Sequence, residues 1–190
     1  MRRPSVRARG VIDFVSYLRT TIPGCAERVL ARIPPDSQQA CEHALPTDWL
    51  SVEHSRRWTQ AFVAEVGPER AREAFADFIE GWIVRSPLLK PLAEAVIRIS
   101  GMSPAAVIRV IPRALAISYR DFFEPRVLEI EDRRAVVLLE SLAPEVASCP
   151  AYLVVFSGIF EGAIRFAGRG GKVTVTLEGN STARCVFEWR

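Results

Sequence analysis

The chain has 190 residues, a length that suits one domain, and 49% of them are hydrophobic, which is enough to form a sizeable core. No apolar run reaches the roughly 18 residues of a membrane-spanning helix. No apolar stretch follows the charged N-terminus in the manner of a signal peptide. The sequence therefore predicts a cytoplasmic globular protein.

The net charge of +3 is unevenly distributed. Residues 1–10 carry four arginines and no acid, whereas the rest of the chain has 21 basic and 22 acidic side chains. A nucleic-acid-binding domain usually has its basic patch on the folded body, so we expect no nucleic-acid partner. We expect residues 1–10 to be a basic flexible tail that folding does not need, and residues 11–190 to form a single domain.

Apolar residues recur at helical spacing through most of the first two thirds of the chain. Proline and glycine separate the segments, and Ser103-Pro104 is a strong helix start. Pro112 lies inside the last segment, so we expect a kink or a break there. The expected helices cover residues 11–18, 25–33, 37–44, 52–66, 71–82, 88–99 and 104–115.

The pattern changes at Pro125. Val- and Leu-rich or alternating segments predict strands at residues 126–131, 134–140, 172–178 and 183–189, and a strongly apolar segment predicts a buried helix at 149–167. The order is helices followed by β-β-α-β-β. This order predicts an α+β fold with an antiparallel sheet and the apolar helix on one face.

Gly158 and Gly162 lie four residues apart within the apolar helix. Glycine costs about 1 kcal/mol relative to alanine in a helix interior. Two glycines on one stripe predict that another backbone passes very close, either in the protein's own sheet or in a second copy of the chain. We therefore treat both as close-packing or interface residues, and expect Gly162→Leu to be destabilising.

The sequence contains no convincing set of catalytic or metal-binding residues. The four cysteines, with no C-x-x-C pair, are expected to be buried thiols. Cys41 and His43 are two residues apart, so on a helix they diverge rather than form a catalytic pair. His43 and His54 lack the i, i+4 spacing of a zinc helix. Gly168 to Gly171 precede a strand, unlike a phosphate-binding loop. We expect no metal and no catalytic residue.

Most aromatic residues lie on apolar helical stripes and are expected to pack in the core. Some could instead line a pocket between the helices and the sheet. We expect Tyr119, Phe122 and Phe123 to be partly exposed. The candidate pocket residues are Trp82, Tyr119, Phe122, Phe123, Tyr152 and Phe156.

The last forty residues carry a recognisable set of motifs. They are Cys149-Pro150, Ser157-Gly158-Ile159-Phe160-Glu161-Gly162, Val173-Thr174-Val175, Gly179 and Cys185-Val186-Phe187. This set resembles the end of 4-vinyl reductase domains, whose architecture also occurs in haem–NO-binding domains and in subunits of the TRAPP tethering complex. At full length, the positions of Trp49, Trp82 and Phe187-x-Trp189 resemble an uncharacterised family expanded in myxobacteria.

The resemblance implies a TRAPP-like or haem–NO-binding-like fold but neither haem nor zinc. Haem–NO-binding domains use a histidine in a central helix and a Tyr-x-Ser-x-Arg motif. This chain has only His43 and His54, both early, and Ser118-Tyr119-Arg120 has a different arrangement. Zinc-binding relatives use a cysteine on a strand that here offers Val173, Val175 and Leu177, and Asn180 replaces the aspartate of the following turn. We expect no cofactor.

These observations favour a non-catalytic sensory or adaptor domain that binds a small apolar ligand or a protein partner. The alternative is a purely structural homodimerisation module without a ligand, and an uncharacterised enzyme is third. Because TRAPP-like relatives commonly pair through helices, the resemblance also implies a homodimer.

Overall fold

The computed structural model describes residues 3–190, and Met1 and Arg2 lie outside the described residues. Helices dominate the first two thirds of the chain, as expected. They are α1 (Ala8–Thr21), α2 (Cys25–Arg32), α3 (Pro35–His43), α4 (Val52–Val66), α5 (Pro68–Arg85), α6 (Lys90–Ser100), α7 (Pro104–Ser118), α8 (Pro144–Ala147) and α9 (Pro150–Phe166). None of these described helices is long and apolar enough to cross a membrane.

The last third forms a four-stranded antiparallel sheet in the order β4-β5-β7-β6. Its strands are β4 (Glu124–Ile130), β5 (Arg134–Glu140), β6 (Gly171–Glu178) and β7 (Thr182–Trp189). Both predicted hairpins are present, with Val127 opposite Val137 in the first and Val175 opposite Cys185 in the second. The predicted α+β class and the β-β-α-β-β order are therefore confirmed.

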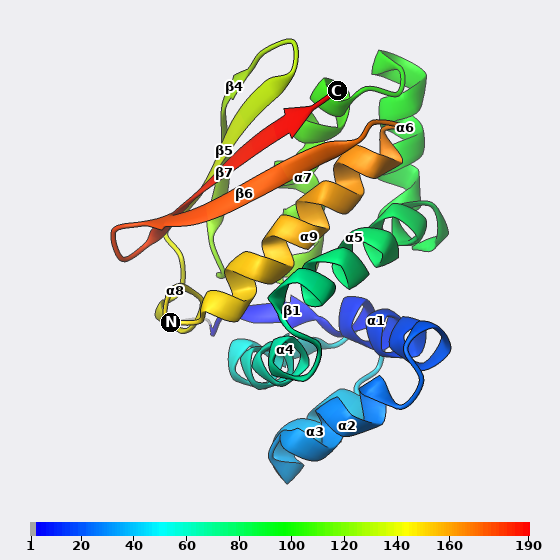
Figure 1. Cartoon of the computed structure of the whole chain (residues 1–190), viewed down its shortest axis with the longest axis vertical. Coiled ribbons are helices and arrows are strands. Elements are labelled where there is room, and N and C mark those ends of the chain that lie inside the picture. Colours follow the sequence, from blue (N-terminus) through cyan, green and yellow to red (C-terminus); the bar gives the residue numbers. More distant parts are fainter. Residues whose placement is uncertain (1–2) are drawn as a thin grey trace.

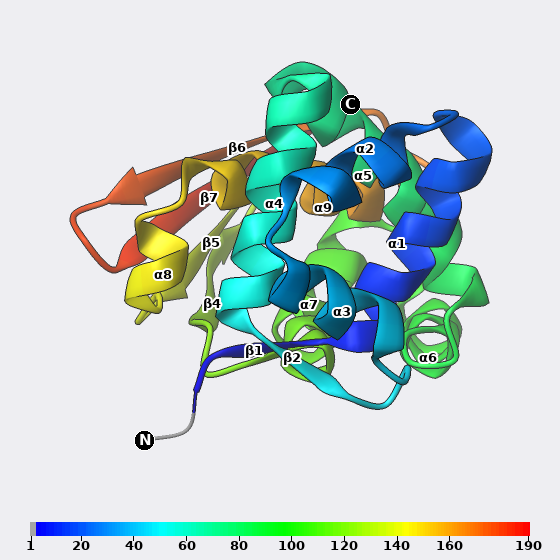
Figure 2. The same cartoon turned by 90° about the horizontal axis from the view of Figure 1, so that it is seen from below.

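Helix α9 is sandwiched in the middle of the molecule. One side of it lies on the sheet, and α5 runs along the other side (Figures 1 and 2). Phe160 and Phe187, whose ring centroids are 5.3 Å apart, join α9 to the sheet. Because both sides are covered within one chain, the nearly all-round apolar character of α9 needs no further explanation.

Two features of α7 were expected and one was not. Ser103 caps the helix, since its Oγ accepts a hydrogen bond from the backbone amide of Ala106 at 3.2 Å, and Pro104 occupies the first turn. The helix then continues through Pro112 to Ser118, so of the two expected alternatives, a kink or a break, the break does not occur.

The expectation of a flexible tail at residues 1–10 was wrong for the part that the structure describes. Ser5–Arg7 forms β1, the central strand of a second antiparallel sheet between β2 (Trp49–Ser51) and β3 (Tyr119–Arg120). Val6 pairs with both Leu50 and Tyr119, and its side chain is buried. The arginines alternate with small apolar residues, so the local charge hid a buried strand.

We accordingly expect deletion of residues 1–7 to destabilise the protein by about 2 kcal/mol or more, because it removes the burial of Val6 and the hydrogen bonds of a central strand. Urea unfolding followed by circular dichroism measures the effect. Deletion of residues 1–3 alone is the control and should change the unfolding midpoint little. An unchanged midpoint for the longer deletion would show that β1 contributes nothing to stability.

Candidate functional site

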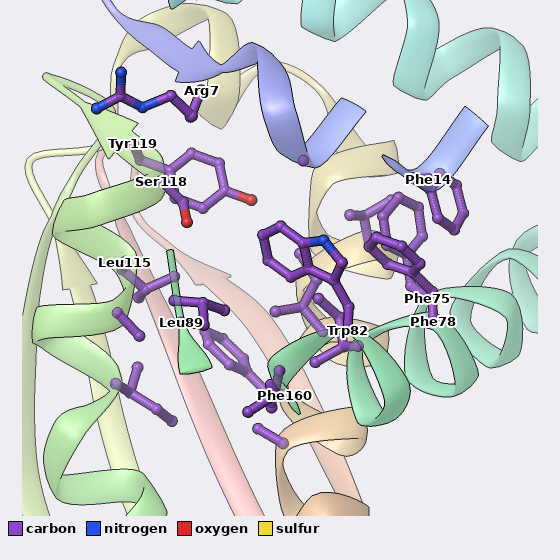
Figure 3. Close-up of a pocket in the computed structure, with 18 of the residues that line it drawn as sticks. Arg7, Phe14, Phe75, Phe78, Trp82, Leu89, Leu115, Ser118, Tyr119 and Phe160 are labelled. Atoms are coloured by element: carbon purple, nitrogen blue, oxygen red, sulfur yellow. The ribbon is translucent and has the colours of Figure 1, made fainter. Parts of the chain in front are cut away.

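A cavity of about 170 Å³ lies between α1, α5, α6, α7 and α9 (Figure 3). Its lining is almost entirely aliphatic and aromatic. The most prominent side chains are Phe75, Phe78, Trp82, Leu89, Leu115 and Phe160. Protein interiors contain few voids larger than a water molecule, so a cavity of this size in an apolar core is a candidate ligand site.

An aromatic cluster centred on Phe14 holds the wall on the α1 side. The Phe14 ring stacks on Phe75 with centroids 4.0 Å apart and meets Phe62 and Phe78 edge to face at 5.3 and 5.0 Å. Such pairs prefer offset-stacked or edge-to-face geometry. The cluster locks α1, α4 and α5 together, so this wall is rigid.

Trp82 is fixed by a hydrogen bond to α1. Its indole Nε1 donates to Asp13 Oδ2 at 2.7 Å, and the same oxygen accepts from Arg9 Nε at 2.7 Å. Because the polar edge of the indole is satisfied outside the cavity, the ring presents an apolar surface to the interior. The Arg9–Asp13 pair thus holds one wall of the cavity in position.

The wall formed by α6 is much less tightly packed than the others. Leu89, Leu92, Ala93 and Val96 line the cavity, yet Ala93 is the one residue of 90–99 that is buried. Ser86-Pro87 precedes the helix and Gly101, with φ of 70°, ends it. Segments with few buried contacts are the ones that open most easily, so we expect α6 to be the wall that moves most readily.

Two tyrosines bring hydroxyl groups to the cavity. Tyr152 donates to Ser55 Oγ at 3.0 Å, which ties α9 to α4. Tyr119 projects its hydroxyl into the cavity towards Trp82 (Figure 3). Burial raises the pKa of both phenols well above the ordinary value of 10, so both are neutral at physiological pH.

The six predicted pocket residues divide into two groups. Trp82, Tyr119 and Tyr152 line the cavity. The other three, Phe122, Phe123 and Phe156, do not line the cavity. They pack against Tyr119 and Tyr152, mostly in edge-to-face or tilted contacts, with the Phe123 and Phe156 ring centroids 5.4 Å apart. Phe122 is fully buried, so the expectation that it would be partly exposed was wrong. The sequence analysis missed the residues from α6 and α7, whose apolar spacing is that of any core helix.

Gly158 and Gly162 form the close approach that their spacing predicts, but the neighbour is α5. A Cβ on Gly158 would lie 2.3 Å from the carbonyl oxygen of Arg72, and one on Gly162 would lie 2.5 Å from that of Ala76. Neither the sheet nor a second copy occupies this stripe. Within the described chain, the two glycines serve the packing of α9 on α5.

Cys41 and the histidines near it are not arranged as a reactive cysteine site. All four cysteines are buried free thiols, as predicted. Burial raises the pKa of Cys41 to about 11, the opposite of what a nucleophilic thiolate requires. His54 Nδ1 lies 2.9 Å from Ser37 Oγ in a local hydrogen bond. Over residues 3–190, no group of three or more potential ligands gathers as a metal site would require.

Searches of protein-family models and of curated proteins find no match to this chain. Solved structures do match over almost the full length. A mutant H-NOX protein from K. algicida, in its Fe(II) unliganded form, aligns with a TM-score of 0.66 at 10% identity, covering 95% of this chain and 96% of that one. This is the H-NOX fold.

Two further H-NOX structures agree. An oxygen-binding H-NOX domain related to soluble guanylate cyclases, solved as its oxygen complex, has a TM-score of 0.62 at 14% identity and covers 97% of this chain and 95% of its own. A Cs H-NOX mutant that carries an unnatural amino acid has a TM-score of 0.64 at 12% identity and covers 97% of this chain and 96% of its own. Identities this low show a shared fold. The likeness to 4-vinyl reductase, TRAPP and myxobacterial proteins stays an expectation.

The cavity residues do not fit haem. Haem iron in proteins is held by histidine, cysteine, methionine or tyrosinate, and the described lining contains none of the first three. Its two tyrosines have raised pKa values, so neither readily becomes the phenolate that would bind iron. The volume of about 170 Å³ is also close to that of an apolar cavity that holds one benzene molecule. Haem, with four linked pyrrole rings, is too large for such a space.

Proposed function

We propose that this chain is a non-catalytic sensory or adaptor domain that binds a small, largely apolar molecule, without haem, in the cavity between α1, α5, α6, α7 and α9. The observation that carries the proposal is the cavity itself, about 170 Å³ of space with an almost wholly apolar lining. Unfilled volume in a core lowers the free energy of unfolding. A cavity of this size is therefore easier to explain if a bound ligand fills it.

The size of the cavity limits the ligand. An apolar protein cavity of about 150 Å³ stays dry and binds benzene or xenon. The slightly larger volume here suits a molecule built on one substituted ring or a short branched chain. A neighbour with the same fold is an oxygen-binding domain, which supports a sensory use of this interior, though with a different ligand chemistry in this chain.

The loosely packed α6 offers a way to transmit binding. A ligand that contacts Leu92 and Val96 would give this helix apolar contacts that its own packing lacks. A ligand shifts a conformational equilibrium in proportion to its differential affinity for the two states. Occupancy of the cavity therefore favours the conformation in which α6 is docked. The outer surface of α6 would then present the change to a partner.

Calorimetric titration with toluene tests the proposal. We expect wild-type protein to bind toluene, and Ala114→Phe to bind it about tenfold or more weakly, because Ala114 lines the cavity from α7 and a phenyl ring there occupies ligand volume. Ala116→Phe is the matched control, since Ala116 is exposed on the same helix and does not line the cavity.

Wild-type affinity in Ala116→Phe together with lost affinity in Ala114→Phe would place the ligand in the cavity. Equal binding by all three proteins would place toluene elsewhere and contradict the proposal. No measurable binding to the wild type would do the same.

The homodimer remains a prediction. It was expected partly because the apolar helix α9 carries two glycines on one face, and α5 of the same chain already packs against that face. Sedimentation equilibrium at high micromolar concentration measures the oligomeric state directly.

A further inference from the structure

Tyr119 lies where α7, β3 and the N-terminal strand β1 meet. It follows the last residue of α7, begins β3 and pairs with Val6 of the N-terminal strand. Its ring is held from behind by Phe122 and Phe123, with centroids 5.0 and 5.3 Å away. Because β3 and the two phenylalanine rings hold the Tyr119 ring in place, its hydroxyl is directed into the cavity across from Trp82 (Figure 3).

The Tyr119 side chain is half-buried, and its hydroxyl makes no hydrogen bond with any residue of the described chain, whereas the hydroxyl of the buried Tyr152 is paired with Ser55. An interior polar group without a partner costs stability, and native proteins contain few of them. A phenylalanine would fill the same space without that cost. A hydroxyl that is rigid and directed at an empty apolar space therefore indicates a partner supplied from outside the chain.

The surrounding groups limit the charge of that partner. Arg7 reaches the same end of the cavity, but its guanidinium points away from the interior (Figure 3), where Nη1 donates to the Thr47 carbonyl oxygen at 2.7 Å and the group stacks over Trp49 at 4.1 Å. Its Nε is buried without a partner among the described residues. The neutral hydroxyl of Ser118 is the other polar group at this end.

We infer that the Tyr119 hydroxyl is the recognition group of the cavity, and that the ligand is a small, otherwise apolar molecule with one neutral oxygen, such as an alcohol, a phenol or a carbonyl compound. The inference rests on the proposed ligand-binding function and adds the chemistry that selects among apolar molecules. The aromatic and aliphatic walls bind the hydrocarbon part, and Tyr119 pairs with the oxygen. A carboxylate is disfavoured, because the one guanidinium in the described lining, that of Arg7, points away from the interior.

Toluene and phenol are suitable probes, because they have nearly the same shape and differ only in that phenol carries a hydroxyl where toluene carries a methyl group. We expect Tyr119→Phe to weaken phenol binding about threefold to tenfold while toluene binds as tightly as before or more tightly, as measured by calorimetric titration. The ratio of the two affinities is the readout, since loss of a merely structural contact would weaken both probes together.

Tyr152→Phe is the matched control. It removes the same atom from the same cavity, but that hydroxyl is already paired with Ser55, so any change should affect toluene and phenol alike and leave their ratio at the wild-type value. Thermal unfolding of each ligand-free variant provides a second readout. Tyr119→Phe should unfold at the wild-type temperature or above, and Tyr152→Phe below it.

The outcomes separate the two proposals. If toluene binds and Tyr119→Phe leaves the phenol-to-toluene ratio unchanged, the assignment to Tyr119 is wrong and the apolar cavity site stands. Loss of phenol affinity in Ser118→Ala instead of Tyr119→Phe would overturn the assignment in the same way. Tighter binding of benzoate than of phenol would overturn the neutral ligand class. If neither toluene nor phenol binds, the proposed function itself fails.

Discussion

Gly162→Leu is expected to destabilise the protein by about 3 kcal/mol or more, the upper end of overpacking effects. A Cβ at this position would lie 2.5 Å from the carbonyl oxygen of Ala76 and 2.8 Å from the Cβ of Ile79, both on α5. Neither atom is the end of a flexible side chain, so α5 and α9 must separate to admit a leucine. Urea unfolding monitored by tryptophan fluorescence measures the loss.

The matched control is Gly81→Ala, a second glycine inside a helix. The nearest atom to its added Cβ would be Nη2 of Arg85, the mobile end of a side chain, at 2.7 Å. Because alanine has the higher helix propensity, this variant should be neutral or more stable by up to about 1 kcal/mol. Native stability of Gly162→Leu would show that α5 and α9 do not pack as closely as the structure has them.

Phe14→Ala is expected to destabilise the protein by about 3–5 kcal/mol, the usual cost of deleting a buried aromatic side chain. Phe14 is fully buried and touches Phe62, Phe75 and Phe78, so its removal leaves a hole at the contact of three helices. Because the ring also lines the cavity between the helices, the hole would join the existing space. Chemical denaturation gives the free energy of unfolding.

Leu45→Ala removes a large apolar side chain that is 63% exposed, and serves as the control. Its effect should stay within about 0.5 kcal/mol, as for most surface substitutions. Equal losses in the two variants would mean that the Phe14 cluster is not the centre of the helical core.

The long elements could be predicted because their periodicity extends over many residues. Helix α5 and strands β5, β6 and β7 all appear near their expected bounds. The three-residue strands β1 and β2 could not be predicted, since a period of two has no statistical weight over so few positions. Strand β1 was further disguised by its arginines, whose charge suggested a tail although Val6 between them is buried.

The candidate site was only half visible in the sequence. Trp82, Tyr119 and Tyr152 stand out because large rings with a polar group are unusual in a core. Residues such as Leu92 and Ala114 carry no such signal, because a wall of a cavity and a filled core demand the same apolar pattern. Whether a helix packs against neighbours or against empty space depends on distances between elements, which local sequence does not encode.

The α5–α9 pairing also sets the order of events during synthesis. Arg72 of α5 and Glu161 of α9 are 89 residues apart in the chain. At about 5–20 residues per second, a ribosome takes roughly 4 to 18 seconds to make the intervening segment. During that interval the apolar face of α5 has no cover from its main neighbour. The nascent chain therefore exposes the face of α5 around Ala76 and Ile79 until α9 emerges. The helical half completes its folding only after the first hairpin of the sheet, β4-β5, has been made.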